Sequence, residues 1–96
     1  MGFVSKKEEL DIFVALENPK RYNMLVFLKD NGGRATHYDI LKHSGLEEAE
    51  YIRHVNKLLE HRIVQPSSDF YKFGNTMESF IEIAEMGEKA LQLIKN

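Results

Sequence analysis

The change of hydrophobic period near residue 62 constrains the fold more than any other feature of the chain. From Glu47 to about His61, apolar residues recur every three or four positions, which predicts an amphipathic helix. The residues of this apolar stripe are Tyr51 or Ile52, Val55, Leu58 and Leu59. From Ile63 to Phe73, β-branched and aromatic residues lie on both sides of a break at Pro66, which predicts a kinked strand. From Ser79 to Ala84, apolar and polar residues alternate, which predicts the returning strand. We therefore predict a long helix that is followed directly by a β-hairpin.

Helix-start and helix-stop signals place two helices before this unit. Ser5 and Glu8 have the spacing of a capping box, so a first helix is expected over residues 5–17. Asn18-Pro19 begins a second helix, because Asn caps a helix well and Pro favours the first helical turn. Asn31-Gly32-Gly33 ends it after about Asp30, since these residues tolerate positive φ.

Two shorter helices complete the predicted order. Thr36 and Asp39 form another hydroxyl-to-carboxylate start, and Ser44-Gly45 ends the helix after about two turns. A last helix is expected from about Met86 to Lys95. The short helix, the sharp turn and the long helix have helix-turn-helix proportions, and the hairpin after them has the position of a wing.

Composition excludes several classes of protein. With 96 residues the chain has the length of one domain, so we expect residues 1–96 to form one unit. The 13 basic and 15 acidic residues give a net charge of -2, so any basic surface must be local. There is no cysteine, which excludes disulfides, thiolate metal sites and cysteine nucleophiles.

Motifs for catalysis, metal binding and membrane insertion are also missing. No two of the four histidines are four residues apart, and no glycine-rich phosphate loop or nucleophile motif is present. No apolar run approaches the roughly 18 residues that a membrane span needs. We therefore expect a cytoplasmic protein that is not an enzyme and has no cofactor, no bound metal and no contact with a membrane.

Three segments of the chain resemble winged-helix transcription regulators of the ArsR and MarR kind. These segments are residues 17–25, with Glu17-Asn18-Pro19-Lys20-Arg21 at their start, residues 45–64, and residues 81–91. The chain is also similar to small winged-helix proteins of archaea and archaeal viruses. The resemblance implies a mainly α fold with a small β-hairpin, in which residues 18–84 form the winged-helix core. The helix over residues 5–17 and a C-terminal helix over residues 85–96 would pack in a dimer.

The resemblance further implies a homodimeric, sequence-specific regulator that binds double-stranded DNA. Helix 47–61 would enter the major groove, and the wing over residues 63–84 would reach the flanking minor groove or backbone. Arg53 is the expected base or phosphate reader, Lys57 a phosphate contact, and the start of helix 37–44 a phosphate site. The implied DNA-binding residues are Thr36, His37, Tyr38, Glu48, Glu50, Arg53, His54, Lys57, Lys72 and Asn75. The implied dimer interface contains Leu10, Phe13, Val14, Leu91 and Ile94.

Two features leave other outcomes open. Arg62 stands where ArsR-type chains commonly have Gly, so it must either adopt an unfavourable backbone angle or follow a different exit path. Glu47, Glu48 and Glu50 crowd the start of the long helix and repel phosphate. The alternative is a protein-protein interaction module with the same fold, which uses this acidic face to bind a basic partner. A third hypothesis is a ligand- or pH-responsive regulator that uses His54 or His61.

Overall fold

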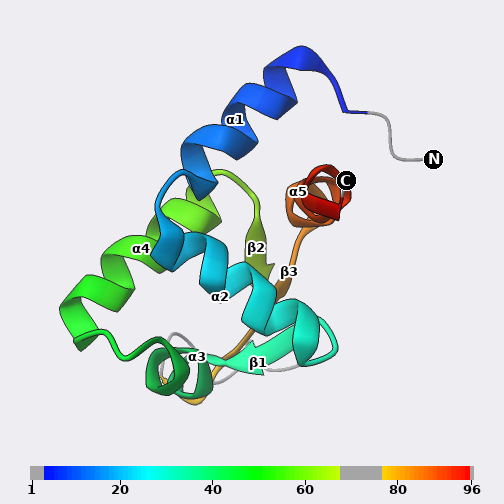
Figure 1. Ribbon diagram of the computed structural model, residues 1–96. Helices are drawn as coiled ribbons and strands as arrows, with labels where there is room; N and C mark the ends of the chain where they lie inside the picture. The colour runs from blue at the N-terminus through cyan, green and yellow to red at the C-terminus, as the bar shows by residue number, and fades with distance from the viewer. Residues whose placement is uncertain (1–3, 68–76, 96) are drawn as a thin grey trace.

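A computed structural model describes residues 4–67 and 77–95 of the chain. The predicted helices are all present, and their order along the chain is the predicted one (Figure 1). The elements are α1 (Lys6–Leu16), α2 (Pro19–Asp30), β1 (Arg34–Thr36), α3 (His37–Ser44), α4 (Glu48–Glu60), β2 (Val64–Pro66), β3 (Phe80–Ile83) and α5 (Glu85–Lys95). This order is that of a winged helix-turn-helix with a helix added at each end.

The predicted capping residues begin the first three helices. Ser5 accepts a hydrogen bond from the Glu8 amide at 3.2 Å, while the Glu8 carboxylate accepts one from the Ser5 amide at 3.1 Å. Asn18 caps α2 by accepting from the Lys20 amide at 2.8 Å, with Pro19 in the first turn. Thr36 caps α3 in the same manner, because its hydroxyl accepts a hydrogen bond from the Asp39 amide at 3.1 Å. Local sequence therefore fixes where these helices begin.

Positive backbone angles end α3 and α4. Gly45 follows α3 with φ of 72°, the conformation that glycine adopts without steric cost. Arg62 follows α4 with φ of 59°, and it is the one residue other than glycine with positive φ in residues 4–67 and 77–95. Arg62 thus takes the unfavourable angle, and not a different exit path. The amide of Ile63 then bonds the Leu58 carbonyl at 2.9 Å and closes the end of the helix.

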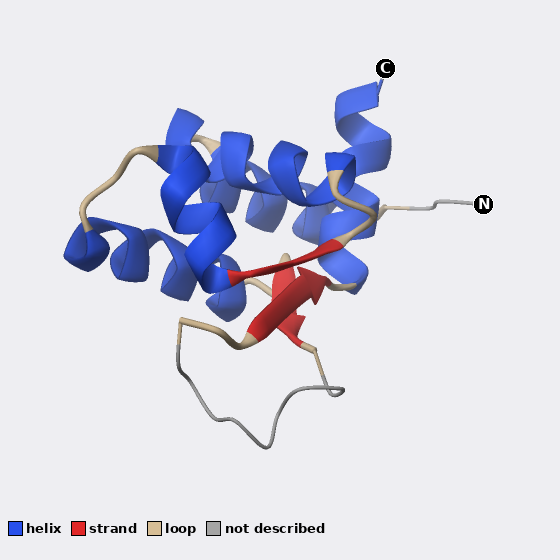
Figure 2. Ribbon diagram, turned by 90° about the horizontal axis from the view of Figure 1, so that it is seen from below, coloured by secondary structure: helices blue, strands red, loops and turns tan. Residues whose placement is uncertain are grey.

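The strands form an antiparallel sheet in the order β1-β3-β2. In β3, Ile81 pairs with Ala35 of β1 on one side and with Pro66 of β2 on the other. Figure 2 shows the strands together on one side of the helices. The sequence predicted only the two strands of the hairpin. The sheet has a third strand, because β1 pairs with the free edge of β3. The predicted strand 63–73 is described only as far as β2, and its second half lies outside the described residues.

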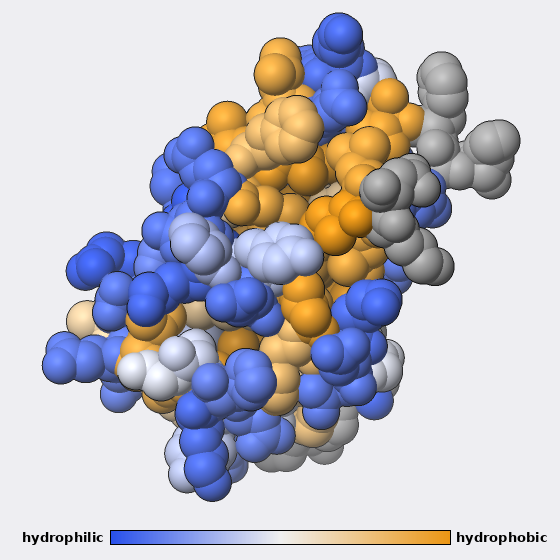
Figure 3. Space-filling view, viewed as in Figure 1, coloured by the Kyte–Doolittle hydropathy of each residue, from blue (hydrophilic) through white to orange (hydrophobic). Residues whose placement is uncertain are grey.

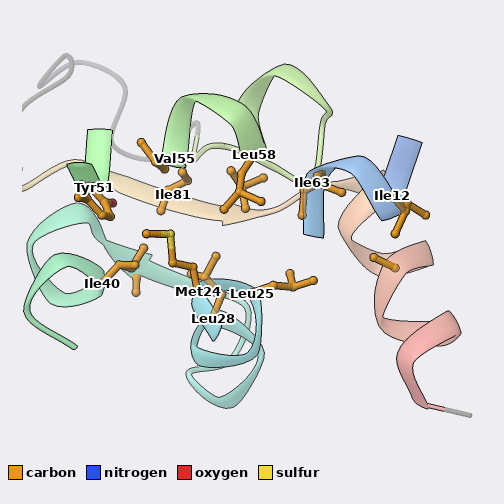
Figure 4. Packing of buried hydrophobic residues seen from close by; sticks show 14 residues of the cluster. Ile12, Met24, Leu25, Leu28, Ile40, Tyr51, Val55, Leu58, Ile63 and Ile81 are labelled. Carbon is orange, nitrogen blue, oxygen red and sulfur yellow. The ribbon is translucent and has the colours of Figure 1, made fainter. Parts of the chain in front are cut away.

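The core lies between α2, α4 and β3. Tyr51, Val55 and Leu58 point from α4 toward Leu25 and Leu28 of α2 and toward the sheet (Figure 4). Ile40 of α3, Ile63 and Ile81 close the same cluster, which extends to Ile12 and Ala15 of α1 and to Ala90 of α5. The first position of the α4 stripe was left open between Tyr51 and Ile52. Tyr51 is fully buried, whereas Ile52 is 40% exposed.

Candidate nucleic-acid interface

The outer face of α4 is a polar surface of the helix-turn-helix. Because Tyr51, Val55 and Leu58 face the core, the opposite side of the helix is left in solvent. The residues exposed on α4 are Glu48, Ala49, Ile52, Arg53, Asn56, Lys57 and Glu60. Lys57 lies 3.7 Å from Glu60 in a solvent-exposed pair, a contact that adds little to stability and leaves the ammonium group accessible.

The first turn of α4 is acidic. Glu47 is the N-cap residue, with no side-chain hydrogen bond to the free amides, and Glu48 and Glu50 follow in the first turn. Negative charge at this end of a helix is favourable for the helix dipole. It opposes the approach of phosphate, so any contact between this turn and DNA must be made to base edges.

Positive charge gathers one turn further along, where α4 passes the start of α2. We call Lys20, Arg21, Arg53 and Lys57, which lie around His54, the α2–α4 basic cluster. Arg21 holds it together, since its Nε donates to the Ala15 carbonyl at 2.6 Å and its Nη1 lies 3.1 Å from His54 Nδ1. Burial lowers the pKa of His54, and the charges of Arg21, Arg53 and Lys20 lower it further against the opposing effect of Glu50. His54 is therefore neutral at pH 7 and faces α2.

His37 has a different environment from the predicted one. Its Nδ1 lies 2.7 Å from the hydroxyl of Tyr51, and the two rings meet edge to face with centroids 5.9 Å apart. Burial lowers the pKa of His37 and raises the pKa of Tyr51, so both groups are uncharged at pH 7. The sequence counted His37 among the DNA-binding residues, and in the structure its imidazole joins the start of α3 to the buried side of α4.

The amides at the start of α3 are also occupied. The His37 amide donates to the Ser79 carbonyl at 3.1 Å, and the Tyr38 amide donates to the Met77 carbonyl at 2.9 Å. The Asp39 amide is bonded to the Thr36 hydroxyl. These three amides therefore already have partners within the chain, whereas the sequence predicted that they bind phosphate. The side chains of Thr36 and Tyr38 remain on the surface, and Tyr38 is 54% exposed.

The structure thus brings part of the predicted set together. Arg53 and Lys57 lie on the outer face of α4, with Glu48 and Glu50 one turn away. Lys72 and Asn75 lie outside the described residues. Lys20 and Arg21 were quoted only as part of a resemblance, although their place after the Asn18-Pro19 start already put them in the first turn of α2. No sequence signal joined that turn to α4, since this contact is made by the tertiary fold.

A second surface is apolar and lies on the terminal helices. On α1, Leu10, Phe13 and Val14 are 61%, 59% and 49% exposed, and on α5 Ile94 is 37% exposed. The two helices are joined by an ion pair of 2.8 Å between Glu8 and Lys89. Figure 3 shows hydrophobic side chains gathered over this part of the molecule. We call Leu10, Phe13, Val14, Leu91 and Ile94 the α1–α5 apolar face.

In the part of the chain that the structure describes, no group of three or more His, Asp or Glu side chains is arranged to hold a metal ion. Among the described helices, none combines the length and the apolar character that crossing a bilayer requires.

These elements define a winged helix-turn-helix protein with a polar outer face on α4 and an apolar surface on its terminal helices. The solved structure of an ArsR family transcriptional regulator has the same fold, with a TM-score of 0.68. The match covers 97% of this chain and 89% of that chain at 17% sequence identity, so it includes the terminal helices. No family model and no curated protein matches the sequence. The fold prediction is confirmed.

Proposed function

We propose that the protein is a homodimeric transcription regulator that binds double-stranded DNA sequence-specifically and catalyses no reaction. The observation that carries this proposal is the outer face of α4, which presents Arg53, Asn56 and Lys57 to solvent from a helix held rigidly by the core. Helices of this kind dock in the major groove, where Arg and Asn distinguish bases by paired hydrogen bonds. The fold shared with an ArsR family transcriptional regulator supports the same function.

The α2–α4 basic cluster provides the electrostatic part of this function. Lys20, Arg53 and Lys57 are exposed, and Arg21 fixes the position of α2 against α4 through the Ala15 carbonyl. A local concentration of cations compensates for the overall charge of -2 and for the acidic first turn of α4. We infer that phosphates on one side of the groove lie against this cluster, while Thr36 and Tyr38 approach the backbone on the other.

The α1–α5 apolar face supports the dimer. Large aliphatic and aromatic side chains that are about half exposed on neighbouring helices are unfavourable in water and favour a partner surface. A twofold dimer would present two copies of α4 to two half-sites, separated by about one helical turn of DNA or a multiple of it. An inverted repeat in the bound sequence is the expected result.

The test compares one arginine variant and one lysine variant. Their binding is measured on DNA duplexes recovered by selection from a random library. Arg53→Ala should weaken binding of the selected duplex by about 1 to 3 kcal/mol and relax selectivity at one base pair per half-site. Lys29→Ala, which removes an exposed charge from the far end of α2, is the control and should leave affinity within about twofold. Equal affinity of the Arg53 variant for the selected duplex would remove α4 from the reading of DNA.

The acidic first turn of α4 favours a second candidate, a module that binds a basic protein. Glu47 and Glu48 are exposed, and neither carboxylate is needed to cap the helix. Charge reversal of both residues should abolish capture of such a partner in a pull-down and leave the fold intact. Unchanged capture, or a gain in DNA affinity without any loss of a protein partner, would count against this candidate.

A further inference from the structure

Ile52 is the one large apolar side chain on the outer part of α4. Its side chain is 40% exposed. By contrast, Tyr51, the residue before it, and Val55, three positions after it, are both buried. The core of the helix is complete without it, because Tyr51, Val55 and Leu58 fill the contact with α2 and β3. An exposed helical position favours a straight-chain polar residue over a β-branched one, so Ile52 has no local reason to be there.

The neighbours of Ile52 define what it can contact. Ala49 and Asn56 lie one turn before and one turn after it on the same side, and both are exposed. Neither residue is charged, so the three form a narrow uncharged stripe. Arg53 and Lys57 run along one border of this stripe, and the acidic first turn stands at its start. A wholly apolar partner would leave these charges unpaired, which disfavours a second protein core on this face.

The major groove of DNA matches this pattern. Its floor carries one apolar group, the C5-methyl of thymine, beside the hydrogen-bonding edges of the other bases. Its walls are phosphates, which suit Arg53 and Lys57. Because a β-branched side chain in a helix strongly prefers one χ1 rotamer, the two γ carbons of Ile52 are ordered before binding.

From this arrangement we propose that Ile52 determines specificity by packing on the C5-methyl group of a thymine in each half-site, with Ala49 completing the apolar contact. The proposal rests on the proposed function of the protein, since it names the base that this face of α4 recognises. The bound DNA sequence should therefore contain a thymine that is preferred for its methyl group. Hydrogen bonding to the base edge cannot explain this preference, because uracil has the same hydrogen-bonding groups.

The experiment removes the methyl group alone. Selected duplexes are prepared with each thymine replaced in turn by deoxyuridine, which keeps every hydrogen-bonding group of the base. Wild-type protein should lose affinity by about fourfold at one position per half-site, the ratio expected for loss of one buried methyl group. Ile52→Ala should bind the thymine and uracil duplexes equally well, and Ile52→Val should show an intermediate ratio.

Lys57→Ala is the matched control on the same helix. It should weaken binding of the thymine and uracil duplexes by the same factor and so keep the fourfold ratio between them. A wild-type protein that is insensitive to uracil at every position, or an Ile52→Ala variant that keeps the full ratio, would overturn the inference while leaving DNA binding in place. Failure of the library to yield any enriched duplex would instead overturn the proposed function and this inference with it.

Discussion

Helices α1 and α4 pack on the same core and differ in what they turn outward. The exposed side of α1 carries Leu10, Phe13 and Val14, whereas that of α4 carries mainly Arg53, Asn56 and Lys57. The first surface is unfavourable in water and suits a lasting partner of the same kind. The second is well solvated and suits a charged partner whose binding depends on salt. One small core thus carries an apolar surface on one helix and a charged surface on another.

This division has a physical basis in the two helices. α4 buries a single stripe against the core and has a well-separated polar side. α1 buries only Ile12 and Ala15 on the rest of the molecule, and its apolar residues extend over more of its circumference than one contact can cover. The excess on α1 is what a second copy of the chain would bury.

The largest expected effect comes from placing a charge in the α1–α5 apolar face. Phe13→Asp should weaken dimerisation on the order of 100-fold, because association would then bury an unpaired carboxylate in place of an aromatic ring. Sedimentation equilibrium measures this change directly. Lys7→Glu, an exposed charge change on the same helix, should leave the dimer intact. A wild-type protein that is monomeric at high concentration would contradict the proposal that the α1–α5 apolar face forms a dimer.

A second prediction concerns the packing of α5, which supplies part of the same face. A Cβ at Gly87 would collide with the carbonyl oxygen of Ile63 and with the side chain of Ile83. Gly87→Ala should therefore lower the free energy of unfolding by about 1 to 3 kcal/mol despite the better helix propensity of alanine. Denaturant titration should show Glu88→Ala within about 0.5 kcal/mol of the wild type. Equal stability of the two variants would mean that α5 packs less closely than described.

Removal of a charge from α4 should have a smaller and more uniform effect. Lys57→Ala should weaken binding to specific and scrambled duplexes alike, and it should reduce the slope of log affinity against log salt by about one. Titrations at several salt concentrations measure both quantities. A loss confined to the specific duplex would reassign Lys57 from phosphate to a base edge.

The smallest effect is the pH dependence of stability that arises from His37. Its pKa is lowered in the folded chain from 6.5, so its neutral form is favoured by folding. This contribution is fully present above pH 6.5 and is lost as the pH falls through the folded-state value. The free energy of unfolding should thus decrease on acidification, and His37→Gln should flatten the curve. The slope left in the variant should come from His54 and, at lower pH, from Glu8, because the pKa of each is also lowered. A curve unchanged by the substitution would contradict the half-buried position of His37 against Tyr51.

The fold was largely predictable because local sequence determines where its helices begin and end. Caps at Ser5, Asn18 and Thr36, and the turn at Gly45, act within one helical turn and need no tertiary contact. β1 was missed for the opposite reason. Its three residues carry no alternating pattern, and they form a strand only because Ala35 pairs with Ile81, far away in the sequence.

The candidate site was harder to predict, because exposure depends on the fold. Arg53 and Lys57 follow from the helical period alone. The placement of His37 against Tyr51 and of Arg21 against His54 joins elements that only the tertiary structure brings together. The exposure of Ile52 likewise required knowing that Tyr51 takes the buried position.

The most direct test of the account is fluorescence anisotropy of the purified protein with labelled duplex from its own upstream region and with a scrambled duplex, over a series of salt concentrations. We expect tighter binding to the native duplex, with affinity for both duplexes falling steeply as salt rises. Absence of binding to either duplex at low salt would contradict the proposal that α4 recognises DNA, and it would direct attention to a protein partner of the acidic first turn.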